Sequence, residues 1–314
     1  MSPARPGPHD ERALVVGEAL IDVVARADGT REEHPGGSPA NVALGLGRLG
    51  RAVDLLTWLG HDAAGDAVRR HLAASHVRVL TGDRSAVRTP VATAHLDDAG
   101  VATYEFDLEW DLPTTWEGDD ATPLVVHTGS IAAVLEPGGT RVAHEMARRQ
   151  SSATLTYDPN LRPALMGSAE HAAGYVEAMV RLADVVKVSD EDLAWLHPGV
   201  APAEIAEEWT RRGPAIVVVT HGSEGAFAAT SAGARLQVPA PQVTVADTVG
   251  AGDSFMGGLI DGLWSAGLLG AARREALHDV SAETVEAVLT RCARIAAITV
   301  SRAGANPPRS AELD

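Results

Sequence analysis

A chain of 314 residues is long enough to bury a large core, either as one α/β domain or as two smaller ones. Its 26 Lys and Arg against 42 Asp and Glu give a net charge of −16, which disfavours a nucleic acid or an anionic membrane as partner because both would be repelled. Cys292 is the sole cysteine, which excludes a disulfide framework and a cysteine zinc cluster and is typical of a reducing cytosol. No apolar run of about 18 residues is present, and residues 1–12 carry Pro and charge where a signal peptide needs an apolar segment. We therefore expect a soluble cytoplasmic protein with a disordered tail over residues 1–12.

The first predicted elements are a buried parallel strand over residues 13–17 and an extended segment over residues 20–24. Asp22 interrupts the second apolar run. A carboxylate there is costly unless it has partners. Asp22 therefore lies either at a strand end in water or in a cleft, where it binds hydroxyl groups.

A helix is predicted to follow, with Ser38 as its N-cap, Pro39 at its first position and Gly50 after its end. The preceding Gly36 and Gly37 would let the backbone approach a ligand closely. Asn41, in the first turn, either binds vicinal hydroxyl groups or faces solvent as an ordinary polar residue.

Residues 91–96 and 101–106 alternate between apolar and polar side chains, which predicts a hairpin with one wet face. Such a hairpin, standing away from buried parallel strands, is a candidate lid over a binding site.

From residue 124 onward, short apolar runs alternate with helical patterns, which predicts a parallel sheet covered on both faces. Ligands then bind at the carboxyl ends of the strands. Arg162 follows one such strand and either offers its guanidinium fork to a substrate oxygen or forms a surface ion pair with Asp158. Thr220 and Gly222 follow another and could contact phosphate.

Residues 247–255 combine a Gly-rich turn with the start of an apolar helix. Gly250 and Gly252 allow successive N–H groups to converge, and the helix adds its own free N–H groups and positive dipole end. Asp253 would stand beside this anion hole as a general base for a hydroxyl group. The alternative is a plain glycine loop in which Asp253 is the N-cap.

A long helix over residues 282–300 and the loop 302–308 should fold back toward Asp247.

Two blocks of sequence carry a resemblance to a known family. Residues 36–43 read Gly-Gly-Ser-Pro-Ala-Asn-Val-Ala, and residues 247–255 read Asp-Thr-Val-Gly-Ala-Gly-Asp-Ser-Phe. Together they resemble the two motifs of the ribokinase-like (PfkB) carbohydrate kinases, from about residue 13 to residue 308. The resemblance implies a three-layer α/β/α sandwich with a mostly parallel central sheet and a small β lid. It also implies one domain over residues 13–314, with lid segments near 20–36 and 88–110, that transfers the γ-phosphate of ATP to a sugar hydroxyl.

The resemblance also assigns roles by position. Asp253 matches the catalytic base, and the anion hole is formed by Gly250, Ala251 and Gly252. The sugar-binding positions are Asp22, Gly36, Gly37, Asn41, Arg162 and Asp253. The nucleotide-binding positions are Lys187, Ser189, Thr220, Gly222, Gly225 and Gly252. A monovalent cation, expected to be K⁺, is held by Asp247 and by the carbonyl groups of Val249, Arg302 and Gly304.

Residues 158–163 and 187–191 are similar to the fructokinases and the 2-keto-3-deoxygluconate kinases, which both place Arg where Arg162 stands. Fructose is therefore the expected acceptor, and the alternatives are 2-keto-3-deoxygluconate, a nucleoside, or a non-catalytic sugar-binding regulator. The family's Asn-x-x-Glu segment, tied to Mg²⁺ and phosphate, runs here from Ser189 to Asp192, so a water-mediated Mg²⁺ contact would depend on the shorter Asp192 side chain. The expected partners are the sugar, ATP and Mg²⁺, with homodimerisation through the lid.

Other nucleotide-binding classes lack their motifs. A Rossmann dehydrogenase needs Gly-x-Gly-x-x-Gly after its first strand, and residues 17–20 do not supply it. The Gly-x-x-x-x-Gly-Lys-Ser/Thr motif of Walker-type NTPases is also missing from the sequence. A pure binder has no use for a base beside an anion hole, so Asp253 with its two glycines argues against the regulator.

Overall fold

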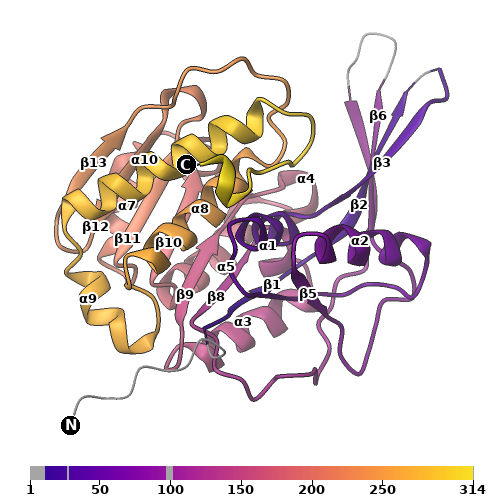
Figure 1. Cartoon of the computed structure of the whole chain (residues 1–314), viewed down its shortest axis with the longest axis horizontal. Helices are drawn as coiled ribbons and strands as arrows, with labels where there is room; N and C mark the ends of the chain where they lie inside the picture. The colour runs from indigo at the N-terminus through magenta and orange to yellow at the C-terminus, as the bar shows by residue number, and fades with distance from the viewer. Residues whose placement is uncertain (1–10, 27, 97–101, 314) are drawn as a thin grey trace.

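The computed structural model describes residues 11–26, 28–96 and 102–313. Within them, a nine-stranded central sheet has the order β13-β12-β11-β10-β9-β8-β1-β4-β5 (Figure 1). Its strands are β1 (Ala13–Val16), β4 (Val53–Leu56), β5 (Val77–Leu80), β8 (Val125–Gly129), β9 (Thr154–Asp158), β10 (Val185–Ser189), β11 (Ile216–Thr220), β12 (Ala226–Thr230) and β13 (Arg235–Val238). The strands from β5 to β11 pair in parallel, and β12 and β13 extend the sheet antiparallel.

Helices cover both faces of this sheet, because its strands are apolar on both sides. Leu14 and Val16 pack into one core and Ala13 and Val15 into the other. One helical layer contains α1 (Ser38–Arg48), α2 (Ala63–Ala73), α8 (Ala251–Ser265), α9 (Arg274–His278) and α10 (Ala282–Val300). The opposite layer contains α3 (Gly138–Arg149), the short α4 (Pro163–Met166), α5 (Ala169–Leu182), α6 (Asp190–Leu196) and α7 (Pro202–Thr210). The expected three-layer α/β/α architecture is confirmed.

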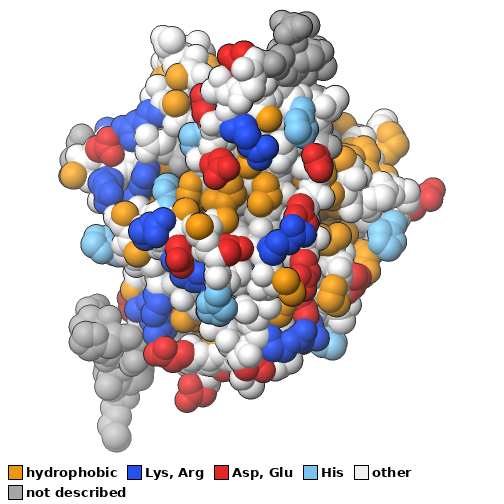
Figure 2. Space-filling model, turned by 90° about the vertical axis from the view of Figure 1, so that its right-hand side faces the viewer, with side chains coloured by type: hydrophobic (Ala, Val, Ile, Leu, Met, Phe, Trp, Pro, Cys, Tyr) orange, Lys and Arg blue, Asp and Glu red, His pale blue; other side chains and the backbone are white. Residues whose placement is uncertain are grey.

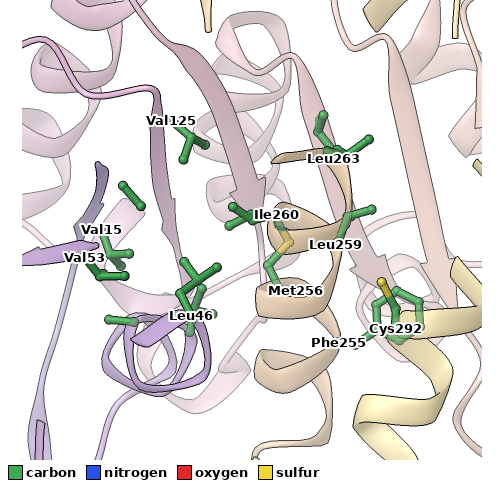
Figure 3. Close-up of a cluster of buried hydrophobic side chains, with 14 of the residues drawn as sticks. Val15, Leu46, Val53, Val125, Phe255, Met256, Leu259, Ile260, Leu263 and Cys292 are labelled. Carbon is green, nitrogen blue, oxygen red and sulfur yellow. The ribbon is translucent and has the colours of Figure 1, made fainter. Parts of the chain in front are cut away.

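Helix α8 lies at the centre of the first layer. Figure 3 shows its apolar side chains, among them Met256 and Ile260, beside those of the neighbouring strands. Cys292 of α10 lies beside Phe255 and is fully buried. Burial raises the pKa of this thiol, so it stays protonated and acts as a small core residue.

A second, four-stranded sheet projects from the body (Figure 1). Its order is β3 (Arg31–Gly36), β2 (Leu20–Arg26), β6 (Val91–Leu96) and β7 (Ala102–Asp107). Strands β2 and β6 pair in parallel, and the other two pairs are antiparallel. The hairpin expected from alternation is therefore present as β6 and β7, and the turn predicted between them lies outside the described residues.

The chain start departs from the expectation of disorder at Arg12. Its guanidinium pairs with the buried carboxylate of Asp54, with Nε 3.0 Å from Oδ2. The rest of that expectation concerns mainly residues 1–10, which lie outside the described residues.

None of the helices in the described part of the chain has the length and apolar character needed to cross a bilayer. Figure 2 shows acidic and basic side chains interspersed on the face that carries the small sheet, without a continuous basic patch on that face.

Candidate active site

Helix α8 begins at the carboxyl ends of the central strands, directly after Gly250. Gly250 has a φ of 75°, in the left-handed region that favours glycine. A Cβ there would also lie 2.6 Å from the Cβ of Ala305, so the start of α8 is packed against the loop that follows α10. The predicted return of the C-terminal loop toward this turn is present.

Asp253 lies in the first turn of α8 and is 7% exposed. The N-cap of α8 is Gly250, so the alternative in which Asp253 caps the helix is wrong. Its carboxylate instead accepts hydrogen bonds from Ser38 Oγ at 2.7 Å, Asn41 Nδ2 at 2.8 Å and Asn160 Nδ2 at 3.5 Å. Three separate segments therefore hold Asp253 in place.

The expectation that Ser38 is the N-cap of α1 is wrong, because Gly37 occupies the N-cap position with a φ of 101°. A Cβ at Gly37 would approach the carbonyl oxygen of Glu18 to 2.6 Å, so only glycine fits there. The hydroxyl of Ser38 is thereby free to contact Asp253 rather than its own helix.

The first turn of α8 presents free N–H groups. Ala251 N–H donates a long hydrogen bond of 3.3 Å to Thr248 O, and Ser254 N–H donates to Gly250 O. The N–H groups of Gly250, Gly252 and Asp253 find no acceptor among the described residues. With the positive end of a 15-residue helix at the same point, the turn can hold an oxyanion.

These groups open on a cavity of about 570 Å³. Of the expected sugar-binding and anion-hole residues, the cavity is lined by Asp22, Gly37, Asn41, Arg162, Gly250, Ala251, Gly252 and Asp253. Ala92 of β6 and Phe106 of β7 also line it, so the small sheet forms part of its wall. The sequence blocks at the two ends of the chain thus meet in one site.

Asp22 reaches this cavity from β2. Burial raises the pKa of its carboxyl group to about 6, while the nearby Arg162 lowers it. At neutral pH the group is mainly ionised and can accept hydrogen bonds from hydroxyl groups. Gly36 lies directly against it, since a Cβ at residue 36 would be 1.9 Å from Asp22 Oδ2.

For the sugar that the resemblance implies, we expect Gly36→Ala to displace the Asp22 carboxylate and raise the KM by about 10- to 100-fold, because a misplacement of about 1 Å can cost that much. The KM for ATP should stay near the wild-type value. Gly174→Ala is the matched control, since a Cβ at that helical position meets open space. A wild-type sugar KM in Gly36→Ala would contradict the assignment of Asp22.

Arg162 also lines the cavity, from the residue before α4. Its Nη1 donates to the side chain of Asn160 at 2.9 Å and to Leu161 O at 2.8 Å. The alternative ion pair with Asp158 is not formed, because that carboxylate is fully buried and bonded elsewhere.

The partner of Asp158 is Lys187, whose Nζ lies 2.9 Å from Asp158 Oδ2. Burial raises the pKa of Asp158 to about 6 and Lys187 lowers it, so the pair is ionised at neutral pH. A Cβ at Gly252 would be 2.9 Å from Lys187 Nζ. The ammonium group therefore lies beneath the first turn of α8, where it adds positive charge to the anion-binding turn, and it does not line the cavity.

The remaining nucleotide positions lie along the carboxyl ends of β10 and β11. Ser189 and Thr220 are paired in register there, and Gly222 and Gly225 follow Thr220. None of these four lines the cavity. They form a neighbouring stretch of the same sheet edge, beyond Lys187.

Asp192 is the residue expected to hold Mg²⁺ through water. Its Oδ1 accepts the N–H of Leu161 at 3.0 Å, and its own N–H donates to Ser189, the N-cap of α6. The described residues contain no cluster of three or more His, Cys, Asp or Glu that could hold a metal ion. Mg²⁺ is commonly bound by one or two carboxylates with waters and substrate phosphates, so a single Asp fits such a contact.

Asp247 is the anchor of the expected cation site. Its Oδ1 accepts the N–H of Val249 at 3.0 Å, and its Oδ2 accepts the N–H of Gly304 at 2.8 Å. It therefore ties the loop before α8 to the loop after α10. Each oxygen keeps a further lone pair, and carboxylate and carbonyl oxygens are the ligands that hard cations take. Arg302 directs its guanidinium to Glu312, which leaves only its carbonyl for such a role.

Four polar residues to which the sequence analysis assigned no specific role also line the cavity: Glu18, Ser130, Asn160 and Thr248. Glu18 follows β1 directly, and Ser130 and Asn160 follow β8 and β9. A polar side chain at the carboxyl end of a parallel strand is the signal that marks the stretches containing Ser130 and Asn160, and the same signal could have identified Glu18.

The fold and this site define a phosphotransferase acting on a small hydroxyl-bearing substrate. The model of the pfkB family carbohydrate kinases matches residues 10–312, and the chain belongs to this family. It is 34% identical over 263 residues to a fructokinase of Rhizobium leguminosarum bv. trifolii, covering 80% of this chain and 79% of that protein. A fructokinase of Klebsiella pneumoniae is 32% identical, with 81% and 85% covered.

Solved structures show the same fold. A fructokinase from Xylella fastidiosa with bound ATP aligns with a TM-score of 0.84 at 27% identity, covering 97% of each chain. A double mutant of a fructokinase from Vibrio cholerae O395, in a fructose, ADP and potassium ion bound form, aligns with a TM-score of 0.79 at 24% identity, with 97% of each chain covered. The chain is an ATP-dependent sugar kinase of the pfkB family.

Proposed function

We propose that this kinase phosphorylates fructose. The observation that carries the proposal is the placement of Asp253 and Asp22 in one cavity that also includes the N-terminal turn of α8. One sugar molecule in this cavity would then contact a general base (Asp253), the anion-binding turn of α8, and a carboxylate that accepts hydrogen bonds from its hydroxyl groups (Asp22). The relatives named fructokinase at 34% and 32% identity support fructose as that acceptor.

In the proposed reaction, Asp22 and Asn41 orient the sugar and Asp253 accepts the proton of the attacking hydroxyl. The hydroxyl oxygen forms a bond to the γ-phosphorus, the bond to the β–γ bridging oxygen breaks, and ADP leaves. Positioning and charge stabilisation supply most of the acceleration in phosphoryl transfer. The free N–H groups of the α8 turn and the buried Lys187 provide that stabilisation from this chain.

Mg²⁺, when bound with ATP, neutralises charge on the phosphates. We infer that Asp192 contacts its hydration shell from the start of α6. Ser189 and Thr220 then face the nucleotide along the sheet edge, with the bare backbone of Gly222 and Gly225 beside them.

The test of this proposal is a coupled assay of ADP formation with fructose, 2-keto-3-deoxygluconate, ribose and adenosine. We expect the highest kcat/KM with fructose. Faster turnover of ribose or adenosine would overturn the ketose assignment, and a preference for the sugar acid would select the alternative. If no ADP formed with any of the four acceptors, the non-catalytic sugar-binding regulator would be the remaining alternative.

We infer that the small sheet is a lid. Its strands β6 and β7 supply Ala92 and Phe106 to the cavity wall, and closure would exclude water from the phosphate. Amide hydrogen exchange in β6 and β7 should slow when fructose is added, and unchanged exchange at saturating sugar would count against a lid.

Homodimerisation through the edge strands of this sheet is a related proposal, tested by the mass measured in light scattering.

K⁺ should raise kcat through Asp247, because a cation held there would fix the backbone of the anion-binding turn. We expect kcat to be several-fold lower in a bulky organic cation than in K⁺, and Asp247→Ala to remove the difference. The potassium ion in the Vibrio cholerae fructokinase supports this expectation. Equal kcat in both cations for the wild type would contradict it.

A further inference from the structure

We propose that Glu18, together with Ser130, is a specificity-determining residue that binds one hydroxyl group of the acceptor on the wall formed by the β1–β2 connection and the turn after β8. The inference rests on the proposed kinase function and adds a substrate-binding pair to the same pocket. Glu18 belongs to none of the roles assigned above.

The position of Glu18 points to a ligand. It lines the cavity, yet it is 3% exposed and makes no ion pair with the described residues. Its Oε2 accepts the N–H of Ala132 at 3.2 Å, and the side chain of Ser130 and the backbone of Glu18 itself hydrogen-bond the same carboxyl group. A buried carboxyl group is costly unless its hydrogen-bonding capacity is used, and because Glu18 lines the acceptor cavity, a hydroxyl group bound there could use what remains of that capacity.

The surroundings hold Glu18 rigidly. Its carbonyl oxygen would lie 2.6 Å from a Cβ at Gly37, and a Cβ at the preceding Gly17 would lie 2.3 Å from Pro39 Cγ. Ser130, its partner, has a φ of 57°, which is uncommon for a residue other than glycine. Unusual backbone that packing sustains is found at binding sites, and Ser130 also lines the cavity.

The chemistry of Glu18 complements that of Asp22. Burial raises the pKa of Glu18 to about 8, and hydrogen bonds together with Arg162 lower it from a still higher value. At neutral pH it is therefore mainly a carboxylic acid that can donate a hydrogen bond, whereas Asp22 mainly accepts. The other charged groups that line the cavity are Arg162, Asp22 and Asp253. A sugar hydroxyl or ring oxygen that needs a donor would find it in Glu18.

The experiment compares Glu18→Ala, Glu18→Gln and wild type on fructose and on its monodeoxy analogues. Glu18→Ala should raise the KM for fructose by about tenfold or more, with an unchanged KM for ATP. For the analogue that lacks the contacted hydroxyl, the KM values of variant and wild type should converge, which a merely structural role would not produce. Glu286→Gln, on an exposed face of α10, is the control.

The pH dependence gives a second readout that needs no destabilising variant. The wild-type KM for fructose should rise from about pH 7 to about pH 9.5 as Glu18 loses its proton, while Glu18→Gln, which keeps a donor, should stay flat. A wild-type KM for fructose in Glu18→Ala would overturn the inference. So would a Glu18→Gln profile that rises with the wild type, or an equal loss on every deoxy analogue. If the wild type does not phosphorylate fructose, the proposed function fails instead.

Discussion

Asp253→Asn should lower kcat by about 10²–10⁴-fold, the usual contribution of a general base. The amide cannot accept the proton of the attacking hydroxyl, whereas the cavity and the anion-binding turn are unchanged. The KM values for fructose and ATP should therefore move little. Steady-state kinetics with both substrates near saturation measure the effect.

The fold should tolerate this substitution. In the Asp253→Asn variant the side-chain amide can still accept from Asn41 Nδ2 and can donate to Ser38 Oγ, whose hydroxyl can rotate to accept. The loss of a charge-assisted hydrogen bond costs about 1–3 kcal/mol, so a folded protein is expected. Asp66→Asn is the matched control, because Asp66 is an exposed acidic residue in the first turn of α2. If Asp253→Asn kept more than about a tenth of the wild-type kcat, Asp253 would not be the base.

Lys187→Met should lower the free energy of unfolding by about 3–5 kcal/mol, because it leaves the carboxylate of Asp158 buried without its counter-ion. Lys187 is 3% exposed and Asp158 is fully buried, and the second carboxylate oxygen, Oδ1, has no hydrogen-bond partner among the described residues. Urea denaturation followed by circular dichroism measures the loss. Activity should fall as well, because the charge beneath Gly252 is removed.

The double variant Lys187→Met with Asp158→Asn separates the buried charge from simple loss of packing. Neutralising the carboxylate should restore a large part of the lost stability, while activity stays low. Arg235→Met is the control, since its pair with Glu207 is exposed and should contribute at most about 1 kcal/mol. A double variant no more stable than Lys187→Met would show that the unpaired carboxylate is not the cause.

Elements with strong periodicity were predicted well from the sequence. Helix α10 (Ala282–Val300) has the predicted bounds, because it has an apolar stripe and Ser281 caps its start. The two glycine motifs were found for a related reason. Glycines at Gly37 and Gly250 are required by backbone geometry, so they leave a mark in the sequence wherever the fold needs them.

Other features depend on contacts that local sequence does not encode. Strand β3 is largely charged and exposed, and it is a strand because it pairs with β2. Ser38 has the composition of a helix cap, yet its hydroxyl bonds Asp253, a residue 215 positions away. In the sequence, Glu18 is an ordinary polar residue after a strand. Only in the folded chain does its carboxyl group accept the N–H of Ala132, from the turn after β8. Such roles arise from tertiary structure alone.

The most direct test of the central claim is phosphorus NMR of the wild-type protein with ATP, Mg²⁺ and fructose. The account predicts that the γ-phosphate signal is replaced by ADP and by one new phosphomonoester signal, in equal amounts and only when fructose is present. Release of inorganic phosphate without a sugar phosphate, or no loss of the γ-phosphate signal under conditions in which the protein is folded, would contradict it.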